Sequence, residues 1–171
     1  RGASSAEELF ATAATLGIEA LAITDLNSLS GIVRAHEAAK ATGIRLIVGS
    51  RLCLTDNTEL LVYPTDRPSY SRLCRLLSLG KSRAGKARCQ LTWADLALWQ
   101  EGIIAILVPD RVDTAFEKNL SHLKEIYGDR AYCAMTLQRR PRDQLRLAQI
   151  SNLARSRGIS TFATNDVLFH I

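Results

Sequence analysis

Carboxylates follow two apolar segments of the chain, at points where β-strands are expected to end. Asp25 follows the segment 20–24, and Asp166 follows the segment 160–164. A carboxylate just past a buried parallel strand is a common position for a metal ligand or a catalytic group. Each residue also has a structural interpretation, because Asp25 could cap a helix that starts near residue 28 and Asp166 could stabilise a turn. The sequence favours capping slightly for Asp25 and leaves both interpretations open.

Few other metal ligands accompany these carboxylates. One expected strand runs into Arg51, and a later one runs into Pro109. A metal site needs several His, Asp, Glu or Cys side chains that converge. Two of the three histidines, His36 and His122, fall within expected helices, where a surface or hydrogen-bonded role is the more common one. The third, His170, lies near the end of the sequence, where it could reach the mouth of a site or be exposed.

No motif for a nucleophile or a nucleotide is complete. The chain has no G-x-S-x-G elbow. The Gly-Lys-Ser stretch at 80–82 resembles the end of a Walker A motif, but it follows an expected helix and lacks the upstream glycine. We interpret residues 80–91 as an exposed basic loop, which could contact a phosphate backbone or be a plain solvated surface.

Basic residues are unevenly distributed along the chain. Lys and Arg exceed Asp and Glu by 22 to 17, and this net charge of +5 permits a polyanionic partner. Residues 67–94 contain seven basic residues and no acidic one, and residues 139–157 contain six arginines and one aspartate. Solvated helix faces explain such runs equally well. The residues selected as candidates for contacting DNA or a docking partner are Lys81, Arg83, Lys86, Arg88, Arg139, Arg140 and Arg142.

The composition is that of one globular domain. The chain has 171 residues, of which 47% are hydrophobic and 23% charged, and no linker divides it, so we expect 1–171 to form a single domain. The four cysteines form no C-x-x-C pair, which favours free thiols in a reducing compartment. No apolar run approaches the length of a membrane span, and no signal peptide opens the sequence. We therefore expect a cytoplasmic protein without a membrane partner.

The elements that would position these residues alternate between helix and strand. Helices are expected at about residues 5–16, 28–41, 68–79, 92–100, 113–126 and 142–157. Strands are expected at about residues 20–24, 45–49, 59–63, 103–108, 131–137 and 160–164. Several glycines separate a helix from a continuous apolar run, as is typical of strands buried on both faces of a parallel sheet. The pattern predicts an α/β fold, with an open sheet or a barrel and a site at the strand ends.

Six stretches of the chain resemble the PHP (polymerase and histidinol phosphatase) domain, and more closely the PHP domain of bacterial C-family DNA polymerases. They keep the family's order and spacing and lie at 2–9, 20–25, 30–33, 43–49, 70–76 and 163–167. The Asn-Asp-Val-Leu-Phe-His stretch at 165–170 is similar to the error-prone branch. The resemblance implies a distorted (β/α)7 barrel. Because the sequence begins with an expected helix, we expect the barrel to lack at least its first strand.

An active PHP site resembles a phosphoesterase centre, with up to three metals held at the strand ends by His, Asp, Glu and Cys. This chain departs from the family's ligands at five positions: Leu26, Arg51, Glu59, Pro109 and Leu168. Asp25 and Asp166 remain, Glu59 would be an unusual ligand, and the family's first His-x-His motif would lie before residue 1. Since leucine cannot bind a metal and arginine is a permanent cation, we expect no metal, and Arg51 paired with Asp25 or Asp166.

The resemblance further implies an error-prone DNA polymerase as the parent protein. The parent would add deoxynucleotides to a primer in DNA replication and damage-tolerant (translesion) synthesis, using two Mg²⁺ ions held by aspartates in another domain. Its partners would be DNA and other translesion-synthesis proteins. The residues of this chain would form a catalytically degenerate structural module without a cofactor, packed against the rest of the polymerase. Two alternatives stay open: an active metal-dependent PHP phosphoesterase or 3′–5′ exonuclease, and a non-enzymatic α/β regulatory or binding domain.

Overall fold

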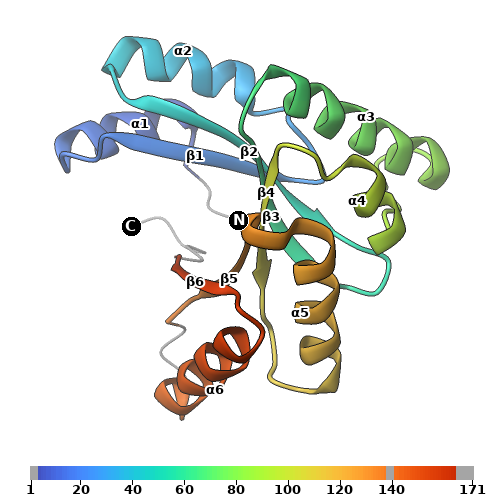
Figure 1. Ribbon diagram of the computed structural model, residues 1–171. Helices are drawn as coiled ribbons and strands as arrows, with labels where there is room; N and C mark the ends of the chain where they lie inside the picture. The colour runs from blue at the N-terminus through green and yellow to red at the C-terminus, as the bar shows by residue number, and fades with distance from the viewer. Residues whose placement is uncertain (1–3, 138–140, 165–171) are drawn as a thin grey trace.

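A curved sheet with helices around it makes up the computed structural model, which describes residues 4–137 and 141–164 (Figure 1). The helices are α1 (Ala6–Thr15), α2 (Ile32–Thr42), α3 (Arg67–Ala84), α4 (Trp93–Trp99), α5 (Thr114–Tyr127) and α6 (Asp143–Ser156), with a 3-10 turn η1 at Gly128–Arg130. The strands are β1 (Ala20–Leu26), β2 (Arg45–Cys53), β3 (Glu59–Pro64), β4 (Ile103–Val108), β5 (Ala131–Met135) and β6 (Ser160–Ala163). The expected α/β fold is confirmed, and each expected helix and strand is present.

The strands follow one another across the sheet in chain order, from β1 to β6. β1 and β2 are parallel, as are β4, β5 and β6, but β3 runs antiparallel to both of its neighbours. Only residues 54–58 join β2 to β3, and so short a connection permits a hairpin but no crossover. The expectation of a parallel sheet is therefore wrong at β3.

Local hydrogen bonds explain where several helices begin. Ser5 and Glu8 form a capping box at the start of α1, and Thr92 and Asp95 form another at α4. The boundaries of two helices differ from the expected ones. α2 begins at residue 32 and not near 28, and α3 continues through Ala84, so the first five residues of the expected loop 80–91 are helical.

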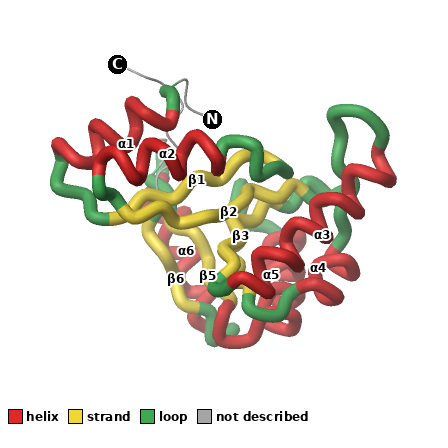
Figure 2. Tube along the Cα trace, turned by 90° about the horizontal axis from the view of Figure 1, so that it is seen from above, coloured by secondary structure: helices red, strands yellow, loops and turns green. Residues whose placement is uncertain are grey.

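Two groups of buried side chains hold the helices on the outer face of the sheet. Phe10 of α1 packs with the buried alanines of α2 and with Leu21 and Ile23 of β1. The larger group joins α3, α4, α5 and α6 to β2, β3, β4 and β5. Figure 2 shows α1 and α2 beside β1 and β2, whereas α3 and α4 lie farther along the molecule.

The inner face of the sheet is covered less than the outer face within the described residues. All four residues of β6 are exposed, and Ile47 of β2 is exposed as well. The expectation of strands buried on both faces is therefore wrong for β1 and β6, which are the edge strands among the described residues and do not pair with each other, whereas most of β4 is buried. The described part of the chain contains no helix that is both long and apolar enough to cross a membrane.

Candidate functional site

The ends of the strands bring several of the predicted residues to one edge of the sheet. Asp25 and Leu26 end β1, and Arg51 lies opposite Leu26 on β2. Because β3 is antiparallel, its first residue, Glu59, reaches the same edge, where it lies opposite Cys53 of β2 and Val108 of β4. The reversed strand thus adds a carboxylate to an edge that otherwise consists of the carboxyl ends of strands.

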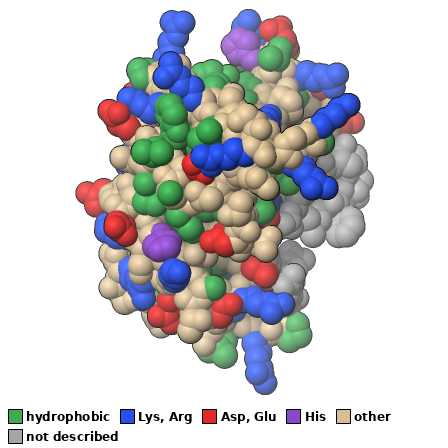
Figure 3. All heavy atoms as spheres, turned by 90° about the vertical axis from the view of Figure 1, so that its right-hand side faces the viewer, with side chains coloured by type: hydrophobic (Ala, Val, Ile, Leu, Met, Phe, Trp, Pro, Cys, Tyr) green, Lys and Arg blue, Asp and Glu red, His purple; other side chains and the backbone are tan. Residues whose placement is uncertain are grey.

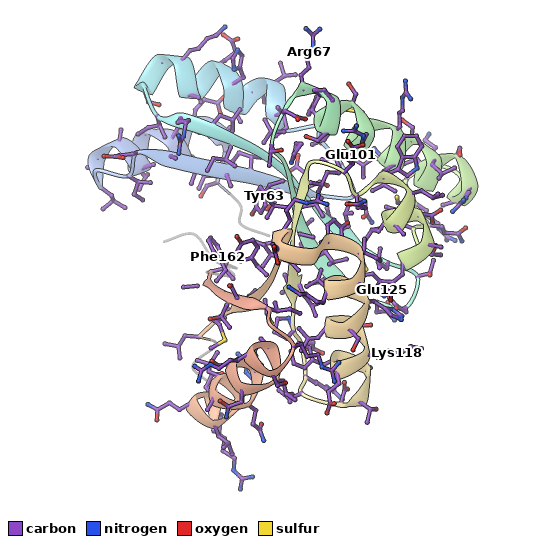
Figure 4. The ribbon with its side chains drawn as sticks, in the orientation of Figure 1. Tyr63, Arg67, Glu101, Lys118, Glu125 and Phe162 are labelled. Carbon is purple, nitrogen blue, oxygen red and sulfur yellow. The ribbon has the colours of Figure 1, made fainter. Side chains whose placement is uncertain are left out.

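A cavity of about 880 Å³ opens along this edge and the inner face of the sheet. Its polar lining comprises Thr24, Asp25, Arg51, Glu59, Tyr63, Tyr132, Thr136 and Thr164. Its apolar lining comes from inward side chains of the strands, including Ile47, Leu61, Ile104, Ile106 and Phe162. Figure 4 shows Tyr63 and Phe162 projecting from β3 and β6 toward this space. The cavity is therefore apolar along the strands and polar at their ends.

The carboxylate of Asp25 holds the loop that leads into α2. It accepts a hydrogen bond of 2.6 Å from the backbone N–H of Gly31 and one of 3.3 Å from the Ser30 hydroxyl. A Cβ atom at residue 31 would lie only 2.7 Å from Asp25 Oδ2, so the glycine leaves room for this carboxylate. Asp25 thus fastens the start of α2 from the end of β1, although the N-cap residue of this helix is Gly31 and not Asp25.

Arg51 forms an ion pair with Glu59, a partner that the sequence analysis did not suggest. Asp25 is bonded to the loop before α2, and Asp166 lies outside the described residues, as does Leu168. The side chains of Arg51 and Glu59 are 14% and 27% exposed, so most of the pair is removed from water. A guanidinium beside a carboxylate satisfies the charge of both groups.

The described residues at this edge do not form a metal site. Leu26 is 60% exposed and offers no ligand atom, and the guanidinium of Arg51 would repel a cation. Pro109, where the family has Cys or His, is buried beyond the end of β4. Across 4–137 and 141–164, no three His, Cys, Asp or Glu side chains converge in a way that could hold a metal ion.

Two further residues were not singled out from the sequence: Tyr63, which lines the cavity, and Cys53, which lies opposite Glu59 at the edge. Tyr63 is half-buried, and burial raises the pKa of its phenol. Its ring lies against Gly49, where a Cβ atom would come within 2.7 Å of the ring carbons, so a glycine inside a strand was the available signal. Cys53 donates its backbone N–H to Asn27 Oδ1 at 3.0 Å. Burial raises the pKa of the Cys53 thiol. The Glu59 carboxylate raises this pKa further, and the charge of Arg51 lowers it.

The histidines do not join this edge. His36 is exposed on α2, and the ring of His122 on α5 meets Trp93 edge-on at a centroid distance of 5.4 Å. His170 lies outside the described residues. His36 therefore has the expected surface role, whereas the buried Nδ1 of His122 has no hydrogen-bond partner among the described residues, so a hydrogen-bonded role is not found for this nitrogen.

The two expected basic surfaces are separate. Lys81 and Arg83 lie in the last turn of α3, and Arg142 directly precedes α6. Figures 1 and 2 place α3 and α6 on opposite sides of the molecule. Arg83 pairs with the buried carboxylate of Asp95 at 2.8 Å, so its charge is already neutralised. Arg139 and Arg140 lie outside the described residues.

Two solved structures share the fold of this chain. An amidohydrolase from Chromobacterium violaceum superposes with a TM-score of 0.66 at 16% sequence identity, covering 99% of this chain and 83% of that one. A candidate metal-dependent phosphoesterase from Bifidobacterium adolescentis superposes with a TM-score of 0.67 at 12% identity, covering 95% and 82%. At such low identity the likeness concerns the fold alone.

The chain belongs to the PHP domain family, whose pattern it matches over residues 1–152. It is 58% identical over 170 residues to error-prone DNA polymerase 2 of Rhizobium meliloti and 53% identical over 171 residues to error-prone DNA polymerase 1 of Agrobacterium fabrum. It is 46% identical over 172 residues to the error-prone DNA polymerase of Caulobacter vibrioides. Each match includes 99–100% of this chain, but the chain spans only 16% of the length of these relatives. The expected resemblance to the error-prone branch is confirmed.

Proposed function

We propose that these residues form a catalytically degenerate PHP domain within an error-prone DNA polymerase. The polymerase would extend primers on DNA with deoxynucleotides and Mg²⁺ held elsewhere in the protein, in damage-tolerant synthesis in the bacterial cytoplasm. The identity of 53–58% to proteins named error-prone DNA polymerase supports this assignment. The domain itself would serve as a structural module that packs against the rest of the polymerase and, through it, meets other translesion-synthesis proteins.

The ion pair between Arg51 and Glu59 is the observation that carries the degenerate assignment. A cation and its carboxylate partner lie at the edge where the fold would otherwise gather metal ligands. The other carboxylate described there, Asp25, is bonded to the backbone of Gly31. Such an edge keeps its shape without a Lewis acid, and metal-assisted cleavage of a phosphodiester needs that acid.

The test uses the full-length protein that contains these residues. After treatment with a chelator and buffer exchange, elemental analysis should show fewer than one zinc, manganese or iron per chain. Primer extension should require Mg²⁺ and deoxynucleotides, and added Mn²⁺ or Zn²⁺ should not produce 3′–5′ cleavage of the primer. Absence of primer extension would overturn the assignment to a polymerase.

An active phosphoesterase of the same fold is the second candidate. The superposition on a candidate metal-dependent phosphoesterase favours it, although only at the level of the fold. Two or more firmly held metals per chain, together with cleavage of phosphodiesters that a chelator abolishes, would establish this second candidate and contradict the degenerate one.

A further inference from the structure

A basic hollow lies beside the edge that Asp25 and Arg51 occupy. It has a volume of about 660 Å³ and is lined by residues 26–28, which directly follow Asp25, and by residues between 81 and 89. Lys81, Lys86 and Arg88 supply its charge, and we call this site the basic hollow. Among the described residues, its lining contains no Asp or Glu. Figure 3 shows basic side chains standing out over the upper part of the side formed by α3, α4 and α5.

The loop that carries these cations is fastened to the rest of the domain. Gln90 donates its backbone N–H to the carbonyl of Gly80 at 2.9 Å, and Thr55 donates to the carbonyl of Leu91 at 2.9 Å. Leu91 is buried, and Cys89 lies so close to Gly80 that a Cβ atom there would be 2.6 Å from its sulfur. Lys86 and Arg88 are therefore presented from a backbone that is held at both ends.

The neighbouring acidic residue does not neutralise these cations. Asp95 is engaged by Arg83 and by the N–H and hydroxyl of Thr92. Within 4–137 and 141–164, none of the three cations of the basic hollow forms an ion pair. The carboxyl end of α3 stabilises a cation at Lys81, but Lys86 and Arg88 follow the helix and gain little from its dipole. Their charge is thus left for an external anion.

We propose that the basic hollow binds the phosphate backbone of single-stranded DNA. This inference rests on the proposed function, because it assigns a partner to a domain of a DNA polymerase. A recess with cations on one wall and Ser28 on the other suits a single strand, whereas a duplex needs a broader surface. The recess has no aromatic lining on which bases could stack, so the contacts should be sequence-independent and strongly dependent on salt.

The test compares two triple variants of the full-length protein. The first is Lys81→Gln, Lys86→Gln and Arg88→Gln. The control, Lys40→Gln, Lys118→Gln and Arg155→Gln, removes the same charge from exposed residues of α2, α5 and α6. Titration with an oligothymidylate at several salt concentrations gives the slope of log affinity against log salt. The first variant should reduce this slope by about two, because about 0.7 counterion is released for each phosphate of a single strand. The control should keep the slope of the unmodified protein.

Lysine acetylation provides a second measurement, which identifies the lysines that the bound strand covers. Bound oligothymidylate should protect Lys81 and Lys86 from acetylation and leave Lys118, which points away from α5, as reactive as before (Figure 4). Equal slopes for both variants, protection only by duplex DNA, or no protection of Lys81 and Lys86 would each overturn the inference. Primer extension by the same preparation separates the two questions: an active polymerase with an unchanged slope contradicts the basic hollow alone, whereas an inactive protein contradicts the proposed function.

Discussion

At the residue scale, the edge of the sheet depends on charges that satisfy one another. Arg51 and Glu59 come from two strands joined by a hairpin, and both are largely removed from water. A charge removed from water is costly unless a partner compensates it, so the loss of one member leaves the other uncompensated.

We expect Arg51→Ala to destabilise the domain by about 1–3 kcal/mol, because the Glu59 carboxylate then loses its guanidinium partner. Thermal unfolding of the full-length protein, with hydrogen exchange of peptides from β2 and β3, measures the effect. Arg111→Ala is the matched control, since Arg111 and its partner Asp110 are both more than 80% exposed and such pairs contribute little. Equal stability of the two variants would show that the buried pair contributes no more than a solvated one.

The sequence predicted part of this edge but not the ion pair between Arg51 and Glu59. The apolar segment before Asp25 correctly indicated a strand that ends beside the site. Capping was favoured for Asp25, but the N-cap residue of α2 is Gly31, and Asp25 accepts a hydrogen bond from the backbone N–H of that residue instead. The partner of Arg51 was not predictable in the same way. Glu59 reaches the edge only because β3 is antiparallel, and this direction follows from the hairpin and not from the composition of the strand.

At the element scale, the junction between α3 and α4 depends on one carboxylate. Asp95 accepts hydrogen bonds from Arg83 of α3 and from Thr92, the residue that caps α4. Burial acts to raise the pKa of Asp95, but the bonds from Arg83 and Thr92 outweigh it and hold the pKa below its ordinary value. A carboxyl group with a lowered pKa stabilises the folded state only while it is ionised.

We expect the contribution of Asp95 to be fully present above about pH 4, the ordinary pKa of an aspartate, and to be lost as the pH falls through its lower pKa in the folded protein. Asp95→Asn should therefore be less stable than the unmodified protein at pH 7, and the difference should shrink in acid. Denaturant unfolding at several pH values checks this. Asp129→Asn, at a fully exposed position, is the control and should show no such convergence.

The sequence predicted the start of α1 better than the end of α3. Ser5 with Glu8 is a local signal, and the capping box that it predicts is present. The end of α3 was placed too early because Gly80 and the basic residues after it are typical of a loop. In the folded chain Gly80 is buried against Cys89 and Leu91, and this contact with residues farther along the chain supports another turn of helix.

At the scale of the whole molecule, the sheet curves around a cavity that its own side chains line. Inward residues of closed α/β barrels fill the interior and form a packed core. Here the inward residues Ile47 and Phe162 are exposed, and β1 and β6 are edge strands among the described residues. The apolar strands were predicted correctly. Whether their inward side chains are buried depends on what lies beside the two edge strands, and the composition of the strands does not predict this.

We expect other parts of the full-length protein to cover this inner face, as the PHP-type barrel implies. Phe162 is 49% exposed on β6, and a phenylalanine side chain that is fully buried in the whole protein contributes about 1.5–3 kcal/mol. Phe162→Ser should therefore destabilise the full-length protein by an amount in this range and speed hydrogen exchange in peptides from β1 and β6. Leu98→Ser provides the control, because Leu98 is 77% exposed on α4, outside the cavity, and its replacement should change neither measurement. If both variants behave alike, the inner face remains in contact with solvent in the whole protein, and the six strands described here do not belong to a closed barrel.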